Sequence, residues 1–444
     1  MKYKPYHVYK DSGIDWLGEV PEHWHVKRLR FLVTMNPSKQ KVSHLPKDTE
    51  VSFIPMEAVG DDGKLDLERT RTIEEAETGY TYFAEGDVTY AKITPCFENG
   101  KGAVMRMLVG GAGFGTTELT VLRPSLKINS QFLYYLTISS AFRKLGEGSM
   151  YGAGGQKRVP DDFARNFEIG WPDVTEQQYI ANFLARETGR LDTLIEKKRR
   201  IIELLKEKRI ALISHAVTKG LDPNVKMKDS GIEWIGKMPV HWEILPFTKY
   251  VTDKSDYRGA TPEKVQDGVF LVTAKNVRMG YIDYESSQEY VREEDYSDIM
   301  RRGLPHKGDI LFTTEAPLGN VALVDREDIA LAQRIIRFRM MPKRFDGVFT
   351  LFAMMAGYFQ AQLASLSTGS TAEGLKASKL NLLWLVAPRQ KEQRIIADFL
   401  ACETSKIDRM LEKVEAAIEK LTEYRTALIT AAVTGKIDVR EAAT

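Results

Sequence analysis

The stretch "EQQYIANFLARETGRLDTLIEKKRRIIELLKEKRIALISHAVTKGLD" occupies residues 176–222, and "EQRIIADFLACETSKIDRMLEKVEAAIEKLTEYRTALITAAVTGKID" occupies residues 392–438 of the 444-residue chain. About half of the paired positions are identical, at an offset of 216 residues. A second pair, "DSGIDWLGEVPEHW" at 11–24 and "DSGIEWIGKMPVHW" at 229–242, is offset by 218 residues. Because two separate blocks repeat with nearly the same spacing, the chain is built from two halves of nearly equal length.

Each long block predicts one continuous helix. Residues 176–217 contain no proline and a single glycine, and they are rich in Leu, Ile, Glu, Lys and Arg, which are good helix formers. Pro172 and Asp173 mark the start of this helix, and Gly220 marks its end. The second helix is expected to begin after Pro388 and to end near Gly435.

The apolar residues of both helices recur with a seven-residue period, which predicts a coiled-coil seam. The alternative is that each stripe packs against its own globular domain. If a two-fold axis relates the halves, the paired helices run antiparallel. At 1.5 Å per residue, ~42 residues span roughly 63 Å, the length of a spacer. The expected seam residues are Leu184, Leu191, Ile195, Ile202, Leu205, Leu212, Leu400, Ile407, Leu411, Val414, Ile418, Leu421 and Leu428.

Two unlike segments, roughly 30–172 and 246–388, lie between the repeated blocks. They share little beyond "GDVTYAKITP" at 86–95 against "GDILFTTEAP" at 308–317, and a glycine-rich end, "GAGGQKRV" at 152–159 against "GSTAEGLK" at 369–376. One frame with two different inserts is expected of a protein that recognises two different targets. The alternative is a duplicated fold whose second copy has drifted.

The bulk composition is that of an ordinary globular chain, with 43% hydrophobic and 28% charged residues. The net charge of +2 neither indicates nor excludes a nucleic-acid partner, because basic residues can gather on one face. No apolar run approaches the ~18 residues of a membrane span, and the N-terminus lacks the apolar core of a signal peptide. Two cysteines, Cys96 and Cys402, form no framework, which favours a cytoplasmic location.

Taken together, these motifs resemble the specificity subunits of type I restriction–modification systems over the whole chain. The resemblance rests on residues 12–24 and 230–242, on the "EQ" helix starts at 176–184 and 392–400, and on the helix ends at 209–219 and 425–435. Within the inserts, "GFGTTELTVLRP" at 113–124 and "ALAQRIIRFR" at 330–339 also look like that family. One small departure is "TGK" in the second helix end where the first has "TKG".

The resemblance implies an α+β fold with two pseudo-symmetric target-recognition domains separated by an antiparallel two-helix coiled coil. The implied segments are an N-terminal segment with the first domain (1–172), a first spacer helix (173–220), a central segment with the second domain (221–388), a second spacer helix (389–436) and a tail (437–444).

The resemblance also implies the partners. Each domain would recognise one short half-site in double-stranded DNA, and the helix pair would set the gap between the half-sites. Two modification (methyltransferase) subunits would dock on the helices and bring S-adenosylmethionine. Restriction subunits, where present, would use ATP and Mg²⁺ for translocation and cleavage. The chain itself would perform no chemistry and hold no metal.

The residues themselves also predict no active site. A phosphate-binding P-loop requires G-x-x-x-x-G-K-[ST], whereas "FENGKGAV" follows Lys101 with Gly102. The nearest approach to the N/D-P-P-Y/F motif of adenine methyltransferases is "NPSK" at Asn36, which lacks the second proline and the aromatic residue. The repeated tryptophans, Trp16, Trp24, Trp234 and Trp242, are expected to pin the two repeated segments to the helix ends.

Candidate DNA contacts are side chains that suit phosphates or base edges in glycine-rich loops and at strand ends. The alternative for each residue is a role in a solvated loop or in strand packing. We expect Gln333 and Arg334 to lie where the first domain has Thr117 and Glu118. The candidates are Lys92, Thr116, Thr117, Gln156, Lys157 and Arg158 in the first domain, and Lys275, Asn276, Arg278, Gln333, Arg334, Ser370, Thr371 and Lys376 in the second.

Three rival functions lead to different expectations. A stand-alone DNA-binding regulator of bipartite sites would bind tightly without partners. An enzyme of two α/β halves would need a titratable cluster, and none is visible in the sequence. A purely structural coiled-coil adaptor would not need two divergent inserts.

Overall fold

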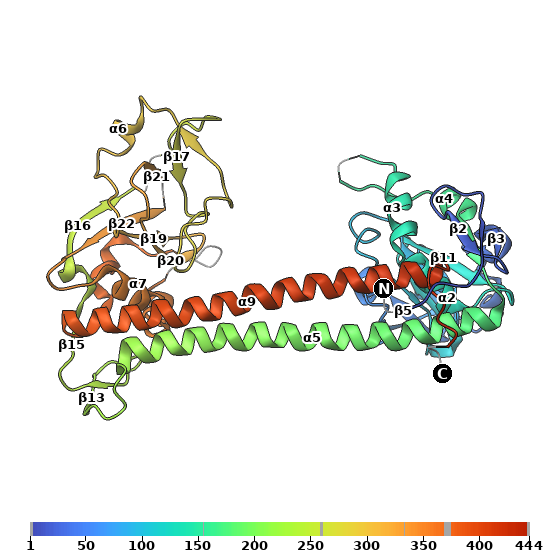
Figure 1. Ribbon diagram of the computed structural model, residues 1–444, viewed down its shortest axis with the longest axis horizontal. Coiled ribbons are helices and arrows are strands. Elements are labelled where there is room, and N and C mark those ends of the chain that lie inside the picture. The colour runs from blue at the N-terminus through green and yellow to red at the C-terminus, as the bar shows by residue number, and fades with distance from the viewer. Residues whose placement is uncertain (1–2, 154, 258–260, 333, 368–373, 442–444) are drawn as a thin grey trace. The chain divides into compact units, whose positions relative to one another are not determined.

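The computed structural model describes residues 3–153, 155–257, 261–332, 334–367 and 374–441. Two long helices dominate it, α5 (Val174–Lys219, 46 residues) and α9 (Gln390–Val433, 44 residues) (Figure 1). Both predicted helices are confirmed, and their ends agree with the prediction to within a few residues. Asp173 accepts a hydrogen bond from the Glu176 backbone N–H (2.8 Å), which is the expected N-terminal cap.

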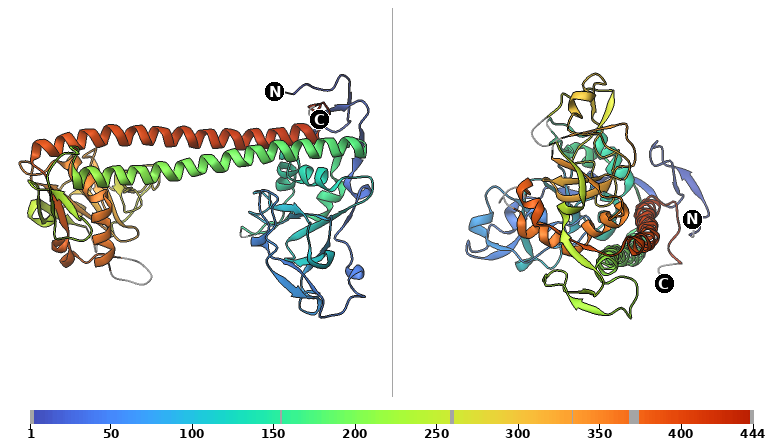
Figure 2. Two further views of the ribbon diagram at one scale, coloured as in Figure 1. Left: turned by 90° about the horizontal axis from the view of Figure 1, so that it is seen from below. Right: turned by 90° about the vertical axis from the view of Figure 1, so that its left-hand side faces the viewer.

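The chain divides into two units, one comprising Met1–Lys198 and Ala416–Thr444 and the other comprising Arg199–Glu415. Each unit therefore holds one variable domain and one half of each long helix. Within each unit the two helix halves lie side by side and antiparallel (Figures 1 and 2).

The same ion pair joins the helices in both units. In the first unit Arg425 Nε donates to Asp192 Oδ1 at 2.8 Å, and in the second Arg209 Nε donates to Asp408 Oδ1 at 3.1 Å. Arg209 and Arg425 occupy equivalent positions of the sequence repeat, as do Asp192 and Asp408. Because the two pairs are equivalent, the internal repeat is a structural pseudo-symmetry as well as a sequence one.

The predicted seam forms the buried face of the helix pair, since none of its thirteen residues is exposed. Leu184 and Leu428 belong to the core of the first unit, and Leu400 belongs to that of the second, with Leu212 packed against it. Other apolar residues of the same helices are exposed, among them Leu194, Ile201, Leu204, Ile210, Ile395 and Met410. The seven-residue period therefore identified the packed face correctly.

Each repeated "DSGI" segment folds into the same small hairpin. In the first unit β1 (Tyr9–Asp11) pairs with β2 (Glu19–Pro21), and in the second β13 (Met227–Asp229) pairs with β14 (Lys237–Pro239). Asp11 accepts a hydrogen bond from the Gly13 N–H and Asp229 accepts one from the Gly231 N–H, both at 2.9 Å. Both glycines have positive φ (73° and 71°), a conformation that disfavours other residues.

These hairpins attach the end of one long helix to the start of the other, and we call each attachment a clasp. In the first clasp the buried Trp24 donates through Nε1 to Glu176 Oε1 at 3.1 Å, and His23 Nε2 lies 2.8 Å from Glu176 Oε2. In the second clasp His241 Nε2 lies 2.9 Å from Glu392 Oε2, beside the buried Trp242.

In each clasp a lysine at the C-terminal end of one long helix binds the hairpin. Lys436 Nζ donates to the carbonyls of Leu17 (3.0 Å) and Glu19 (2.6 Å). Lys219 Nζ donates to the carbonyls of the equivalent residues, Ile235 and Lys237. The clasps explain why one short sequence occurs twice: it closes equivalent helix ends in both units. The prediction that tryptophans pin these segments is confirmed for the buried Trp24 and Trp242. It is wrong for Trp234, which is 48% exposed, and Trp16 stacks on Phe167 of the first domain (ring centroids 5.0 Å apart).

In each unit one buried glutamine of the long helix forms hydrogen bonds that attach the variable domain to this helix. Gln177 Nε2 donates to the Pro172 carbonyl (2.8 Å) and its Oε1 accepts from the Asn129 N–H (2.8 Å). Gln393 Nε2 donates to the Pro388 carbonyl (2.8 Å), and its Oε1 accepts from the Asp346 N–H (2.9 Å). Asn129 and Asp346 are the N-caps of α2 (Ser130–Thr137) and α7 (Gly347–Met355), so the repeated "EQ" serves both clasp and domain.

The first variable domain contains two four-stranded sheets. Its chain enters and leaves through an antiparallel pair, β3 (His25–Arg28) with β12 (Glu168–Trp171). In one sheet β5 and β10 are parallel neighbours, whereas all other pairs of this domain are antiparallel. One sheet has the strand order β4 (Val33–Met35), β11 (Leu119–Pro124), β8 (Val88–Ala91), β9 (Gly102–Val104). The other sheet, with the parallel pair, has the order β6 (Thr70–Thr72), β5 (Glu50–Ile54), β10 (Ala112–Gly115), β7 (Thr81–Ala84).

The second variable domain has a similar topology with different residues, but among its described residues the sheet with the parallel pair has three strands in place of four. Its entry pair is β15 (Glu243–Pro246) with β23 (Trp384–Ala387), and β17 (Val269–Val272) and β21 (Ile329–Leu331) are parallel neighbours. One sheet has the strand order β16 (Val251–Asp256), β22 (Ile335–Met340), β19 (Ile310–Thr314), β20 (Leu318–Leu323). The other sheet has the order β18 (Tyr290–Val291), β17 (Val269–Val272), β21 (Ile329–Leu331). The α+β fold with two pseudo-symmetric domains and an antiparallel helix pair is thus confirmed, whereas the exact segment boundaries stay a prediction.

Short helices complete the two domains. The remaining α-helices are α1 (Ile73–Ala76), α3 (Ser140–Gly148), α4 (Asp161–Asn166), α6 (Tyr296–Ile299) and α8 (Gly357–Leu366). The 3₁₀ helices are η1 (Leu29–Phe31), η2 (Lys39–Lys41), η3 (Met56–Ala58), η4 (Val109–Gly111), η5 (Phe247–Tyr250) and η6 (Ala377–Leu382).

Candidate nucleic-acid interface

A shared aspartate–arginine network supports the same strand in both variable domains. Asp87 receives two bonds from Arg123, Nε to Oδ1 at 2.8 Å and Nη2 to Oδ2 at 2.6 Å, and one from the Ala84 N–H at 2.8 Å. Asp309 receives the same two from Arg339, both at 2.9 Å, and one from the His306 N–H at 2.9 Å. The "GD" dipeptide that both inserts share is therefore a structural anchor.

The second domain adds a fully buried arginine to this network. Arg337 is 0% exposed and donates to Asp309 Oδ2 (2.8 Å), Asp253 Oδ2 (2.5 Å) and Ser255 Oγ (2.6 Å). Burial acts to raise the pKa of Asp309, but hydrogen bonds from Arg339, the His306 N–H and Arg337 outweigh it and hold this pKa below its usual range. Asp309 therefore stays ionised at neutral pH.

In the first domain, β8 directly follows the anchor residue Asp87 and leads into a junction of three segments. The Lys92 N–H donates to the Glu118 carbonyl, and the Val159 N–H donates to the Lys92 carbonyl, both at 2.8 Å. The Thr94 N–H donates to the Lys157 carbonyl at 2.9 Å. The junction thus joins the end of β8, the start of β11 and the end of the glycine-rich loop.

An ion pair lies on this junction. Arg158 donates from Nε to Glu118 Oε2 (2.9 Å) and from Nη2 to Glu118 Oε1 (2.7 Å). The hydrogen bond from Arg158 lowers the pKa of Glu118, so the carboxylate is charged at neutral pH. A shallow pocket of about 400 Å³ beside the pair is lined by Lys92, Tyr151, Arg158, Val159, Pro160, Asp161, Asp162 and Arg165.

The second domain builds the same junction from different residues. The Thr314 N–H donates to the Arg334 carbonyl (2.9 Å) and the Leu375 N–H donates to the Thr314 carbonyl (3.0 Å). Glu315 forms a β-bridge with Gly374, as Ile93 does with Arg158. These matched bonds confirm that Arg334 lies where the first domain has Glu118.

An ion pair lies on the second junction too, but both of its residues come from other positions of the junction: Arg334 is equivalent to Glu118, and Glu315 is equivalent to Ile93. Arg334 Nε lies 3.1 Å from Glu315 Oε1. In the first domain the arginine comes from the glycine-rich loop, whereas in the second it comes from the turn between β21 and β22. A cis peptide bond precedes a proline next to each junction, at Thr94–Pro95 and at Ala316–Pro317. The two domains therefore present different side chains on one backbone arrangement.

The structure brings most of the predicted first-domain residues together at its junction. Thr117, Gln156 and Lys157 are exposed, and Lys92, Thr116 and Arg158 are half-buried. Thr116 Oγ1 accepts the Glu118 N–H at 3.2 Å, so it supports the turn. Whether these residues touch DNA stays a prediction.

In the second domain Arg334 and Lys376 lie at the junction and are exposed. Lys275 is exposed in the loop that follows β17. Arg278 is half-buried in that loop and lies 3.4 Å from Asp283. Because β17 and β21 are parallel neighbours, this loop and the turn that carries Arg334 lie at the same edge of one sheet. Gln333, Ser370 and Thr371 lie outside the described residues.

The structure argues against Asn276 as a DNA contact. Its side chain is fully buried: Oδ1 accepts from the N–H and the hydroxyl of Thr273, and Nδ2 donates to the carbonyls of Asp283 (3.0 Å) and Ser287 (2.8 Å). An amide with these four bonds has no donor or acceptor to spare for a base edge. Asn276 instead fixes the shape of the loop.

Several residues of the junction were not predicted from the sequence. Glu118 and Glu315 pair with the arginines, and Tyr151 and Arg165 line the pocket of the first junction. The anchor residues Asp87 and Asp309 carried a signal, because the "GD" dipeptide is one of the few features that the two inserts share. Glu118 and Arg158 are 40 residues apart, and no local pattern connects them.

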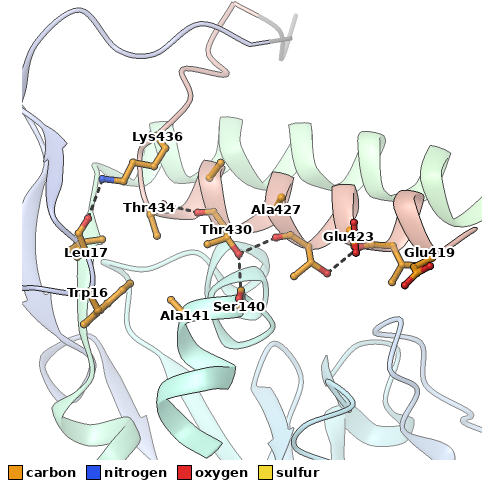
Figure 3. Close-up of a pocket in the computed structure, with 13 residues that line it drawn as sticks. Trp16, Leu17, Ser140, Ala141, Glu419, Glu423, Ala427, Thr430, Thr434 and Lys436 are labelled. Atoms are coloured by element: carbon orange, nitrogen blue, oxygen red, sulfur yellow. Dashed lines mark hydrogen bonds between the residues drawn. The ribbon is translucent and has the colours of Figure 1, made fainter. Parts of the chain in front are cut away.

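A groove of about 880 Å³ runs along α9 in the first unit, between this helix, the start of α3 and the first hairpin (Figure 3). A stripe of threonines at 422, 426, 430 and 434 lines it, and each hydroxyl donates to the carbonyl four residues earlier. Thr430 Oγ1 also accepts the Ser140 N–H at 3.0 Å. Glu419 and Glu423 lie toward one end of the groove and Lys436 toward the other (Figure 3). With its hydroxyls bonded internally, this groove offers a surface and not a reactive centre.

Metal ligands do not gather anywhere in the part of the chain that the structure describes, where no group of three His, Cys, Asp or Glu side chains is placed to hold an ion. Among the described helices, none combines the length and apolar content needed to cross a bilayer.

Comparison with known proteins gives the family. The model of the type I restriction modification DNA specificity domain matches residues 21–206 and 280–420. The chain belongs to this family. The resemblance predicted from the repeated motifs is therefore confirmed, and the two matched segments fall in the two halves of the sequence repeat.

Individual members of the specificity family are also similar. The type I restriction enzyme EcoEI specificity subunit of Escherichia coli is 41% identical over 171 residues, which cover 38% of this chain and only 28% of that relative. The type I restriction enzyme MjaVIII specificity subunit of Methanocaldococcus jannaschii is 25% identical over 342 residues, 75% of this chain and 76% of the relative.

A solved structure shares the fold. It comes from work on complex assembly and conformational transition of the type I R-M system, and it matches 94% of this chain and 99% of its own length with a TM-score of 0.66 at 16% identity. At this low identity the likeness concerns the fold alone.

Proposed function

We propose that this chain is the DNA-recognition subunit of a type I restriction–modification complex and performs no catalysis itself. Each variable domain recognises one half of a bipartite site in double-stranded DNA. S-adenosylmethionine belongs to the modification subunits, and ATP and Mg²⁺ belong to the restriction subunits where these are present.

The observation that carries this proposal is the pair of junctions. Two domains with a similar sheet topology and the same three-segment junction present different side chains, Glu118 with Arg158 in one and Glu315 with Arg334 in the other. A common backbone with different polar side chains is suited to recognising two different short sequences, because base-edge contacts depend on the donors and acceptors presented. The family membership supports DNA as the ligand.

The helix pair is proposed to set the gap between the half-sites. α5 has 46 residues, which at 1.5 Å per residue is a length of about 69 Å. Two weak recognition events joined in one chain act with a high effective concentration. A bipartite site with an unread gap follows from this arrangement.

Exposed apolar residues of the long helices support docking of two modification subunits there. Leu194 on α5 is 41% exposed and Met410, its equivalent on α9, is 52% exposed. Apolar side chains that a helix pair leaves uncovered are candidates for protein–protein contacts. We expect Leu194→Glu and Met410→Glu together to abolish co-purification with the modification subunit. The exposed, polar Lys197→Glu in α5 serves as the matched control and should leave co-purification intact.

Methylome sequencing of a host that expresses the chain with its modification partner tests the recognition function. The expected result is methylated adenines in a motif of two different short halves separated by a fixed unread gap. A contiguous motif, no motif, or methylation by the isolated chain would contradict the proposal. A stand-alone regulator would instead show tight sequence-specific binding without any partner.

Lengthening the helices tests the spacer. Inserting one heptad into α5 and one at the facing position of α9 adds about 10 Å, or about three base pairs at ~3.4 Å each. The gap of the methylated motif should widen by that amount while both halves stay the same. Insertion of four residues in place of seven serves as the control, because it breaks the seam. An unchanged gap after the heptad insertion would exclude the spacer role.

A further inference from the structure

The ion pair on each junction has a feature that stability does not explain. The Arg158 and Glu118 side chains are 38% and 24% exposed, and those of Arg334 and Glu315 are 48% and 43% exposed. Ion pairs this accessible to water contribute little to folding. Yet both domains have one at the same backbone junction, and they build it from different segments.

The geometry of the first pair leaves one edge of the arginine for another ligand. Glu118 engages Nε and Nη2 of Arg158, and a guanidinium has five donors in a fixed planar fork. With Nε and one N–H of Nη2 bonded to this carboxylate, both N–H groups of Nη1 and the second N–H of Nη2 are still donors for a ligand. Restraining the side chain in this way also lowers the entropy lost when it binds a ligand.

The second pair has the same character. Glu315 Oε1 lies 3.1 Å from Nε of Arg334. The Arg334 backbone has a φ of 72°, the left-handed region that a non-glycine residue adopts only at a cost, and such strain clusters at functional sites. In both domains a carboxylate therefore holds an arginine that is exposed beside the strand ends.

We infer that each ion pair is a base-recognition element and that each half-site contains a G·C base pair recognised by Arg158 in one domain and by Arg334 in the other. This inference rests on the proposed DNA-recognition function. An arginine fork that donates to guanine O6 and N7 is the commonest specific contact in the major groove, and a glutamate accepts from cytosine N4. Glu118 and Glu315 are positioning residues that orient the fork. Lys92, Lys157 and Arg165 around the first pair suit the neighbouring phosphates.

The test uses the full chain in complex with its modification subunits and a duplex that carries the methylated motif. Each base pair of the first half is replaced in turn, and the affinity of wild-type, Arg158→Ala, Arg158→Lys and Glu118→Gln complexes is measured at one salt concentration. Arg28→Ala is the control, because Arg28 forms an exposed ion pair with Glu168 (3.0 Å) in the same unit. Replacements in the second half report whether each variant is still folded and assembled.

For the wild type, replacing one G·C pair of the first half should weaken binding by about 5- to 150-fold. Arg158→Ala should weaken binding to the intact site by a similar factor and should no longer discriminate at that one position. Arg158→Lys should keep only part of the discrimination, because an ammonium can still donate to guanine O6 or N7 but lacks the planar fork, and Glu118→Gln should reduce the discrimination at the same position. Arg28→Ala and all preferences in the second half should be unaffected.

Three results would overturn the inference while leaving the proposed function intact. These are a first half without a G·C pair, an Arg158→Ala complex that is weaker on every duplex by one factor, and an Arg158→Ala complex that equals the wild type. A wild-type complex with no bipartite preference would overturn the proposed function and the inference together. The same experiment with Arg334→Ala and the second half is expected to give the mirror-image result.

Discussion

Replacing Gly435 with alanine should open the first clasp. Gly435 has a φ of 72°, and an alanine Cβ at this position would lie 2.4 Å from Pro21 Cδ and 3.1 Å from Trp24 Cζ3. Left-handed backbone costs an alanine roughly 1–2 kcal/mol, and overpacking a rigid site adds about 1–3 kcal/mol. The expected loss of local stability is therefore about 2–5 kcal/mol.

Gly220→Ala provides the matched control in the second clasp. Gly220 has a φ of 77°, but an alanine Cβ there would come no closer than 3.3 Å, to Trp242 Cζ2. We expect this variant to lose only the backbone term, roughly 1–2 kcal/mol. The difference between the two variants isolates the steric contact with Pro21 and Trp24.

Hydrogen exchange followed by mass spectrometry measures the effect in both clasps at once. In Gly435→Ala, amide exchange in residues 11–24 should accelerate by about 30-fold or more, since each 1.4 kcal/mol is a factor of ten. Exchange in residues 229–242 should stay at its wild-type rate. Equal acceleration by Gly220→Ala in its own clasp, or no acceleration by Gly435→Ala, would refute the reasoning.

Three further predictions concern the anchors and the interface. Asp309→Asn should destabilise the second unit by about 3–5 kcal/mol in urea unfolding, because it leaves the fully buried Arg337 short of a counter-charge. Folding lowers the pKa of Asp309, so the contribution of this carboxylate to the free energy of unfolding is complete above about pH 4 and is lost as the pH falls through the lowered pKa. The free energies of unfolding of wild type and Asp309→Asn should therefore converge in acid. Parallel pH profiles of the two proteins would contradict this. Asn276→Ala should destabilise the second unit through its lost loop bonds while the methylated motif stays the same, and an altered base in that motif would restore Asn276 as a DNA contact.

The helical frame could be predicted from the sequence because its signals are local. The Leu and Ile residues of α5 and α9 recur every seven positions, and the residues that form each hairpin lie within fourteen positions of one another. Such patterns survive in a single sequence, and the seam and both helix ends were therefore predicted closely.

The variable domains could not be predicted in the same way, because their decisive contacts are distant in sequence. The parallel pairing of β5 with β10 joins Phe53 to Phe114, and nothing local indicates it. Asn276 resembled a free donor in a polar loop, whereas its burial depends on carbonyls seven and eleven residues further along. Arg158 was predicted as a DNA contact without its partner Glu118, which is supplied by the turn before β11.

The antiparallel entry pairs, β3 with β12 and β15 with β23, have an evolutionary consequence. Each insert starts and finishes on two adjacent strands, so the polypeptide leaves the repeated helical frame and returns to it at one place. An inserted segment that replaces a variable domain needs only to begin and end on this strand pair and to provide a helix N-cap whose backbone N–H donates to the buried glutamine. Recombination at these points can therefore exchange one binding module for another while the scaffold keeps its own hydrogen bonds.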